Sequence, residues 1–222
     1  MDFKLNLSKY KTIVFDCDGV VLNSNKIKVQ AYFEVAKRNG ATDAQAQALA
    51  DHHVAKGSFP RNGKIAWYIE EILKQTATPQ AMQPYLDTFA VVLDEALMNC
   101  EIASGLLDLK TATKHARWML LSGGDQKELR HIFAKRNLAD LFEAGIFGGP
   151  DIKEDVLERE ISHGNLQLPA LFVGDSKYDY QASTGAGLDF VFLSDWTEVT
   201  DWKDFCEQEN VNTVRNLGVL II

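Results

Sequence analysis

The chain contains little cysteine. Cys17, Cys100 and Cys206 are its three cysteines in 222 residues. They are odd in number and far apart, so they match neither a zinc-binding spacing nor the disulfide framework of a small secreted domain. We therefore expect three small buried side chains in a protein of the cytoplasm.

Long apolar runs and an excess of basic residues are also missing. No stretch approaches the ~20 apolar residues that span a bilayer, and the first ten residues, MDFKLNLSKY, lack the apolar segment of a signal peptide. With 23 Lys and Arg against 31 Asp and Glu, the net charge is −8. Such a balance disfavours binding to nucleic acid or to an anionic membrane. We expect a small-molecule partner and a monomer or homodimer.

The apolar residues that are present predict an α/β fold. Four short segments are apolar nearly throughout, as in a parallel sheet that is covered on both faces. They are residues 11–16, 116–123, 169–175 and 188–195, with a weaker candidate at 142–149. Helical patterns over 125–137, 153–164 and 176–187 alternate with the later strands. This alternation predicts right-handed βαβ units in a doubly wound parallel sheet with a Rossmann-like core.

One long stretch interrupts the alternation. From residue 23 to residue 99 the sequence shows only helical periodicity, over 25–40, 41–57, 60–75 and 79–100. We predict an all-helical domain at 23–100, inserted into a core made of 1–22 and 101–222. The insertion follows the carboxyl end of the first strand, where open α/β sheets bind ligands. The tail NLGVLII (216–222) would either add an edge strand or dock on the core.

Aspartates gather at the ends of the predicted strands. Asp16 and Asp18 end the first strand in IVFDCDGVV (13–21), while Asp175 ends a later strand and Asp179 follows it. Aspartates can cap a turn at such places, but a buried charge needs a partner. The carboxyl ends of parallel strands share one edge, so four carboxylates there would repel unless a cation lay among them. Hard oxygen ligands without histidine or cysteine favour Mg²⁺.

Two further features complete a pattern for phosphoryl transfer. Ser122 and the backbone N–H groups of Gly123 and Gly124 form a candidate anion site near the start of a predicted helix. Lys153 opens another predicted helix, where a cation is unfavourable beside the helix dipole, which favours a specific role over that of a solvated lysine. A cation site, an anion site and a free carboxylate together describe phosphoryl transfer.

These motifs, in this order, resemble those of the haloacid dehalogenase superfamily. DCDGVV, LLSGG, Lys153 before a helix and VGDSKYD carry the resemblance. It covers nearly the whole chain and points to the phosphatases with a helical cap after the first strand. The resemblance implies that Asp16 attacks phosphorus and forms an aspartyl-phosphate, and that Asp18 is the general acid and then the general base. It also implies that Ser122 and Lys153 bind the phosphoryl group.

The same resemblance implies the metal ligands and favours one reaction. Mg²⁺ would be held by Asp16, the backbone carbonyl of Asp18 and Asp175, with Asp179 ligating through water or orienting the other ligands. Dehalogenating members lack an aspartate at the position of Asp18, so its presence favours phosphate ester hydrolysis. Two positions depart from the usual pattern: Asn23 stands where many relatives have aspartate, and Ser-Gly-Gly replaces Ser-Asn or Thr-Asn.

The resulting hypothesis is a Mg²⁺-dependent phosphatase for a small phosphorylated metabolite, either a sugar phosphate or a phosphoglycolate-like acid. A sugar phosphomutase and a non-catalytic metabolite-binding module are the alternatives. In the cap, residues 54–64 concentrate Lys56, Arg61 and Lys64. Lys56 and Arg61 are our candidates for contact with a second anionic or hydroxyl-rich group of the substrate; otherwise they belong to a solvated basic loop.

Overall fold

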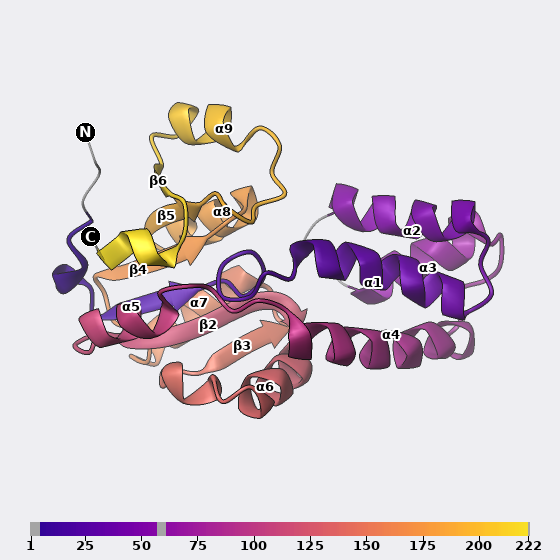
Figure 1. Ribbon diagram of the computed structural model, residues 1–222, viewed down its shortest axis with the longest axis horizontal. Coiled ribbons are helices and arrows are strands. Elements are labelled where there is room, and N and C mark those ends of the chain that lie inside the picture. Colours follow the sequence, from indigo (N-terminus) through magenta and orange to yellow (C-terminus); the bar gives the residue numbers. More distant parts are fainter. Residues whose placement is uncertain (1–4, 57–60, 222) are drawn as a thin grey trace. The chain divides into compact units, whose positions relative to one another are not determined.

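The computed structural model describes residues 5–56 and 61–221, and the chain divides into two compact units. One unit comprises Met1–Asn25 and Glu101–Ile222, and we call it the core unit. The other comprises Lys26–Cys100, and we call it the helical module. Figure 1 labels most of the helices and strands of both units.

The core unit is built on a six-stranded parallel sheet in the order β3-β2-β1-β4-β5-β6. Its strands are β1 (Thr12–Phe15), β2 (Arg117–Asp125), β3 (Ile146–Gly149), β4 (Ala170–Gly174), β5 (Asp189–Leu193) and β6 (Asn212–Val214). The predicted doubly wound α/β fold is confirmed, including the weaker strand candidate, which is β3. In the central pair, Phe15 lies opposite Val173. The residues that follow β1 and β4 therefore emerge side by side.

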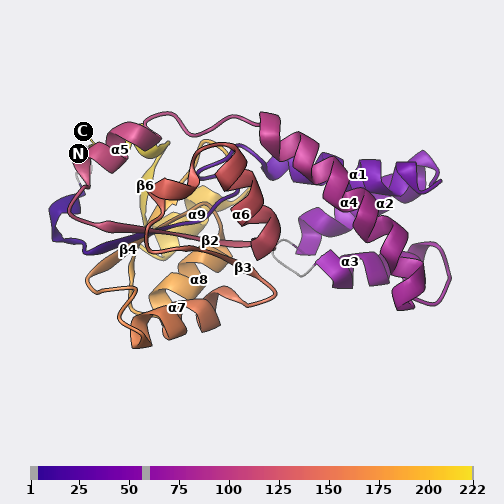
Figure 2. The same ribbon diagram turned by 90° about the horizontal axis from the view of Figure 1, so that it is seen from below.

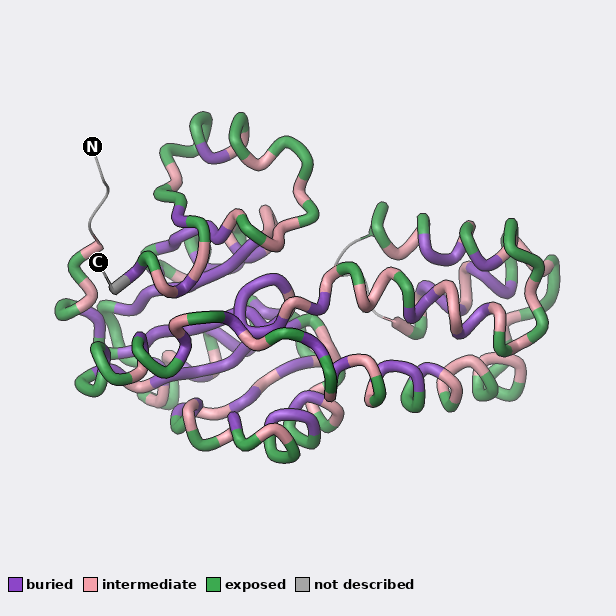
Figure 3. Tube along the Cα trace, viewed as in Figure 1, coloured by how far each residue is buried: buried purple, intermediate pink, exposed green. Residues whose placement is uncertain are grey.

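Apolar residues fill both faces of the sheet, which explains the uninterrupted apolar strand patterns. β1 and β4 are buried along their whole length (Figure 3). On one side lie α5 (Leu106–Ala112) and α6 (Gln126–Lys135), and on the other lie α7 (Lys153–Ser162) and α8 (Lys177–Gly185) (Figure 2). The hydrophobic core between the sheet and the helices α7 and α8 includes Val14, Met119, Val156, Leu157, Phe172 and Ala182.

Short elements near the C-terminus complete the core unit. The sequence patterns missed α5, α9 (Trp202–Gln208) and the edge strand β6. The tail is not an edge strand, because Leu217–Ile221 form a 3-10 helix, η4, which packs against α5. Of the two possibilities for the tail, docking on the core is therefore the one observed.

The helical module consists of α1 (Asn25–Arg38), α2 (Asp43–Lys56), α3 (Arg61–Trp67), the π-helical turn η2 (Tyr68–Ile72) and α4 (Pro79–Asn99). Local signals set several helix ends. Gly40, with φ of +87°, follows α1, and the Thr78 hydroxyl caps α4 by accepting the N–H of Ala81. Across the described parts of both units, no helix is long and apolar enough to cross a bilayer.

Candidate active site

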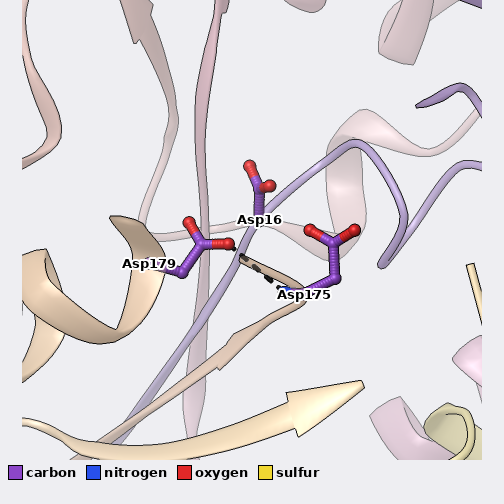
Figure 4. Close-up of side chains that lie close together, drawn as sticks. All are labelled: Asp16, Asp175 and Asp179. Carbon is purple, nitrogen blue, oxygen red and sulfur yellow. Dashed lines mark hydrogen bonds between the residues drawn. The ribbon is translucent and has the colours of Figure 1, made fainter. Parts of the chain in front are cut away.

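Three buried carboxylates meet at the carboxyl edge of the core sheet (Figure 4). Asp16 directly follows β1, Asp175 directly follows the adjacent β4, and Asp179 lies in the first turn of α8. Each offers an oxygen that lies within 4.8 Å of those of the other two. The strand register brings Asp16 and Asp175 together although they lie far apart in the sequence.

Asp179 organises the backbone of this cluster. Its Oδ2 accepts hydrogen bonds from the N–H of Asp175 at 3.2 Å and the N–H of Ser176 at 3.1 Å, and from Ser176 Oγ at 2.7 Å. Ser176 in turn caps α8 in a reciprocal capping box. A Cβ on Gly174 would lie 2.5 Å from Asp179 Cβ. Glycine before Asp175 is therefore needed for this close approach.

Lys153 is the cation of the cluster. Its Nζ lies 2.5 Å from Asp179 Oδ1 and 2.9 Å from Asp16 Oδ1, and the residue is only 4% exposed. Burial alone would lower the pKa of the Lys153 ammonium, but the carboxylates of Asp16 and Asp179 raise it above its usual range. Lys153 is therefore fixed as a charged group beside Asp16.

The cluster carries more negative than positive charge. Three carboxylates face one ammonium group, and burial raises the pKa of Asp16 to about 7 against the opposing effect of Lys153. Burial and the charges of Asp16 and Asp179 likewise raise the pKa of Asp175 well above its usual value. Asp16 Oδ1 is buried, and the Lys153 ammonium lies 2.9 Å from it. A cluster of carboxylate oxygens with an excess of negative charge fits a hard divalent cation.

Asp175 is held by Asn25, which the sequence patterns did not single out, and Gly19 of the DCDGVV motif leaves room for it. The Asn25 amide donates to Asp175 Oδ2 at 2.8 Å and to the carbonyl of Trp196 at 2.9 Å. Gly19 has φ of +74°, and a Cβ there would lie 2.0 Å from Asp175 Oδ2. The glycine that follows Asp18 therefore makes room for Asp175.

Asp18 lies beside two serines. Its Oδ1 accepts a hydrogen bond from Ser24 Oγ at 2.5 Å, and its Oδ2 lies 3.5 Å from Ser122 Oγ. Both serines are buried, at 0% and 1% exposure. Ser24 was not a predicted site residue, because a serine after a loop has no spacing that marks it as a partner of Asp18.

The expected anion site near Ser122 needs one correction. Gly123 and Gly124 belong to β2, and α6 begins at Gln126 with Asp125 as its N-cap. The N–H of Gly124 donates to Ser122 Oγ at 3.1 Å. This backbone N–H therefore already has an acceptor, and the two glycines do not lie at a helix start. Ser122 Oγ itself donates to Asp18 Oδ2. Ser122 and Gly123 stay the predicted members of an anion site.

The two cap candidates belong to the helical module. Lys56 is exposed at the end of α2. Arg61 begins α3, and its guanidinium carbon lies 4.2 Å from the centre of the Phe89 ring. The predicted basic loop includes residues 57–60, which lie outside the described residues. Gly63 lies inside α3, although glycine is unfavourable within helices.

Solved structures share this fold. A protein of Haemophilus somnus described as a predicted phosphoglycolate phosphatase is 20% identical, with a TM-score of 0.67, over 84% of this chain and 86% of its own. A Thermotoga maritima protein provisionally described as a β-phosphoglucomutase is 19% identical, with a TM-score of 0.67, over 95% and 96%. CbbY from Rhodobacter sphaeroides, solved in complex with phosphate, is 14% identical, with a TM-score of 0.70, over 94% and 95%.

At these identities the likeness shows the fold alone, and no curated protein sequence matches the chain. A family model for haloacid dehalogenase-like hydrolases, however, matches residues 10–187. That range contains Asp16, Asp18, Ser122, Lys153 and Asp175. The chain thus belongs to the haloacid dehalogenase-like hydrolases.

Proposed function

We propose that this hydrolase is a Mg²⁺-dependent phosphatase that acts on a small phosphorylated metabolite through an aspartyl-phosphate on Asp16. The observation that carries the proposal is the buried Asp16 carboxylate, held 2.9 Å from the Lys153 ammonium, with Asp18 two residues further along the chain. A nucleophile, a fixed cation and a candidate proton donor are the groups that phosphate ester hydrolysis through a covalent intermediate requires.

Mg²⁺ would be held by the carboxylates of Asp16 and Asp175 and by the backbone carbonyl of Asp18. Asp179 would orient these ligands, because its Oδ2 accepts three hydrogen bonds from Asp175 and Ser176 and its Oδ1 pairs with Lys153. When bound, the ion would offset the negative charge of the carboxylates and of a phosphoryl group.

In the first step an oxygen of Asp16 attacks phosphorus, and the bond between phosphorus and the ester oxygen breaks. The departing oxygen takes the proton of the Asp18 carboxyl group, so the product leaves as an alcohol. Ser122 Oγ and the Gly123 N–H donate hydrogen bonds to phosphoryl oxygens, and the Lys153 ammonium offsets their charge. Asp16 now carries the phosphoryl group as an acyl phosphate.

In the second step the Asp18 carboxylate takes a proton from water, and the water oxygen attacks phosphorus. The bond between phosphorus and the Asp16 oxygen breaks. Inorganic phosphate leaves, the Asp16 carboxylate is restored, and Asp18 is protonated again. Ser24 supports both steps, because its hydroxyl holds Asp18 Oδ1 at 2.5 Å.

The helical module is the proposed source of substrate selectivity. Lys56 and Arg61 would contact a second anionic or hydroxyl-rich group, as in a sugar phosphate or a phosphoglycolate-like acid. Basic side chains that lie near one another in the module, those of Lys28, Arg61 and Lys64, support this. Their effect on one another shows in the pKa of Lys64. Burial, together with the charges of Lys28 and Arg61, lowers the pKa of Lys64 to about 7, and Lys64 Nζ lies 2.8 Å from His53 Nδ1.

A sugar phosphomutase is the second candidate, and the Thermotoga maritima protein provisionally described as one shares the fold. In that reaction the acyl phosphate on Asp16 returns its phosphoryl group to a sugar hydroxyl instead of passing it to water. A non-catalytic module is disfavoured, because the chain holds Asp16, Asp18 and Asp175 together with Lys153. The described cysteines are all free and buried, which supports a place in the reducing cytoplasm.

The test is phosphate release from a panel of phosphorylated metabolites, with and without Mg²⁺, beside the Asp16→Asn variant. The proposal expects Mg²⁺-dependent release that the substitution abolishes. Interconversion of glucose phosphate isomers without release would favour the mutase. Metal binding without either reaction would favour the binding module.

A further inference from the structure

We propose that Tyr178 is a positioning residue that fixes Lys153 for the reaction. This inference rests on the proposed function, in which the Lys153 ammonium offsets phosphoryl charge. Tyr178 Oη accepts a hydrogen bond from the backbone N–H of Lys153 at 3.3 Å and donates one to Glu154 Oε2 at 2.5 Å. One hydroxyl group thus joins α8 to the first two residues of α7.

The start of α7 needs such a partner. The first N–H groups of a helix have no acceptor within the helix and are usually satisfied by the side chain at the N-cap. In α7 the N-cap is Ile152, an apolar residue whose side chain makes no capping hydrogen bond. The hydroxyl of Tyr178 accepts the first of these N–H groups, so the cap comes from a neighbouring helix.

Lys153 is held at both ends by consecutive residues of α8. Tyr178 binds its backbone N–H, while the Oδ1 of Asp179 lies 2.5 Å from its Nζ. The Tyr178 ring centre also lies 6.0 Å from Nζ. A lysine side chain is long and has many rotamers. Anchoring its backbone as well as its ammonium fixes the reach of Nζ toward Asp16.

The Tyr178→Phe variant removes the hydroxyl and keeps the ring. Tyr180→Phe is the matched control, because Tyr180 lies on the same helix and its Oη also donates to a carboxylate, that of Glu209 at 3.0 Å. With p-nitrophenyl phosphate as the probe and Mg²⁺ present, we expect kcat of Tyr178→Phe to fall about tenfold with KM nearly unchanged. Tyr180→Phe should leave both constants at the wild-type value.

A double-mutant cycle separates positioning from a general loss of stability. If Tyr178 acts through Lys153, then Tyr178→Phe should lower kcat much less in a Lys153→Arg background than in the wild type. Urea unfolding of each variant gives the change in stability independently of activity. A folded Tyr178→Phe with wild-type kcat, or two substitutions whose effects on kcat simply multiply, would overturn the inference.

The p-nitrophenyl phosphate assay also distinguishes failure of this inference from failure of the proposed function. A wild-type protein without Mg²⁺-dependent hydrolysis overturns the proposed phosphatase, and the inference with it. An active wild type beside a fully active Tyr178→Phe overturns the inference alone.

Discussion

The amide of Asn25 holds Asp175 Oδ2 at 2.8 Å, and Asn25 is both the last residue of the core unit and the first residue of α1. A candidate metal ligand is therefore fixed by the residue at which the chain leaves the core unit. Hydrogen bonds of this kind orient metal ligands, and their loss commonly weakens metal binding 10–100-fold in proteins.

Asn25→Ala should therefore weaken Mg²⁺ binding about tenfold, because Asp175 loses the donor that orients it. Isothermal titration with Mg²⁺ measures this without any substrate. Asn23→Ala is the control, since the Asn23 amide donates to Glu101 on the exposed surface instead. Equal Mg²⁺ affinity in the two variants would contradict the role given to Asn25.

Gly19→Ala should disrupt the site and not only strain the backbone. Both Gly19 and Gly40 have positive φ, so alanine costs about 1 kcal/mol of backbone strain at either position. The new Cβ at Gly19 would also meet Asp175 Oδ2 at 2.0 Å, whereas nothing lies within 4 Å at Gly40. Urea unfolding should show both variants destabilised and Gly19→Ala the more so. Mg²⁺ titration should show a loss of binding in Gly19→Ala alone.

Ser24→Ala should lower kcat about tenfold, because Asp18 loses the hydroxyl that holds its carboxylate. Steady-state kinetics with p-nitrophenyl phosphate measures this. Mg²⁺ affinity serves as an internal control and should not change. Ser24 contacts the side chain of Asp18, whereas the proposed metal ligand is the backbone carbonyl of Asp18. A wild-type kcat in this variant would show that Ser24 does not position the proton donor.

The buried lysine of the helical module should make stability depend on pH. Burial first, then the charges of Lys28 and Arg61, lower the pKa of Lys64 to about 7, while an unfolded lysine titrates near pH ~10.4. Between these values the unfolded chain binds more protons. The contribution of Lys64 to stability should therefore rise as the pH rises from about 7 to about 10.

Lys64→Met should remove that rise, which urea unfolding at a series of pH values would show. Lys56→Met is the control, because Lys56 is exposed in the same module. A rise of the same size in wild type and Lys64→Met would mean that Lys64 is not the group responsible.

The positions of the central strands and of the carboxylate cluster could be predicted from the sequence for physical reasons. Strands such as β1 and β4 are buried on both faces, so they read as unbroken apolar runs. Parallel strands share a carboxyl edge, so Asp16 and Asp175 could be placed at the same edge of the sheet. Their close approach depends also on the pairing of β1 with β4, which the sequence did not predict.

The residues that hold those carboxylates could not be predicted in the same way. Asn25 and Ser24 act through single hydrogen bonds to Asp175 and Asp18, and no periodicity marks an amide or hydroxyl as the partner of a distant carboxylate. The elements α5, α9 and β6 are only seven, seven and three residues long. Such short segments depend on tertiary packing more than on their own propensity.

The central claim is that Asp16 becomes phosphorylated. Wild-type protein turning over p-nitrophenyl phosphate with Mg²⁺ would be quenched with borohydride, which reduces an acyl phosphate to an alcohol, and its peptides would be mapped by mass spectrometry. We expect reduction of the side chain at Asp16 in the presence of substrate and none without it. Active enzyme with an unmodified Asp16, or with reduction at another carboxylate, would contradict it.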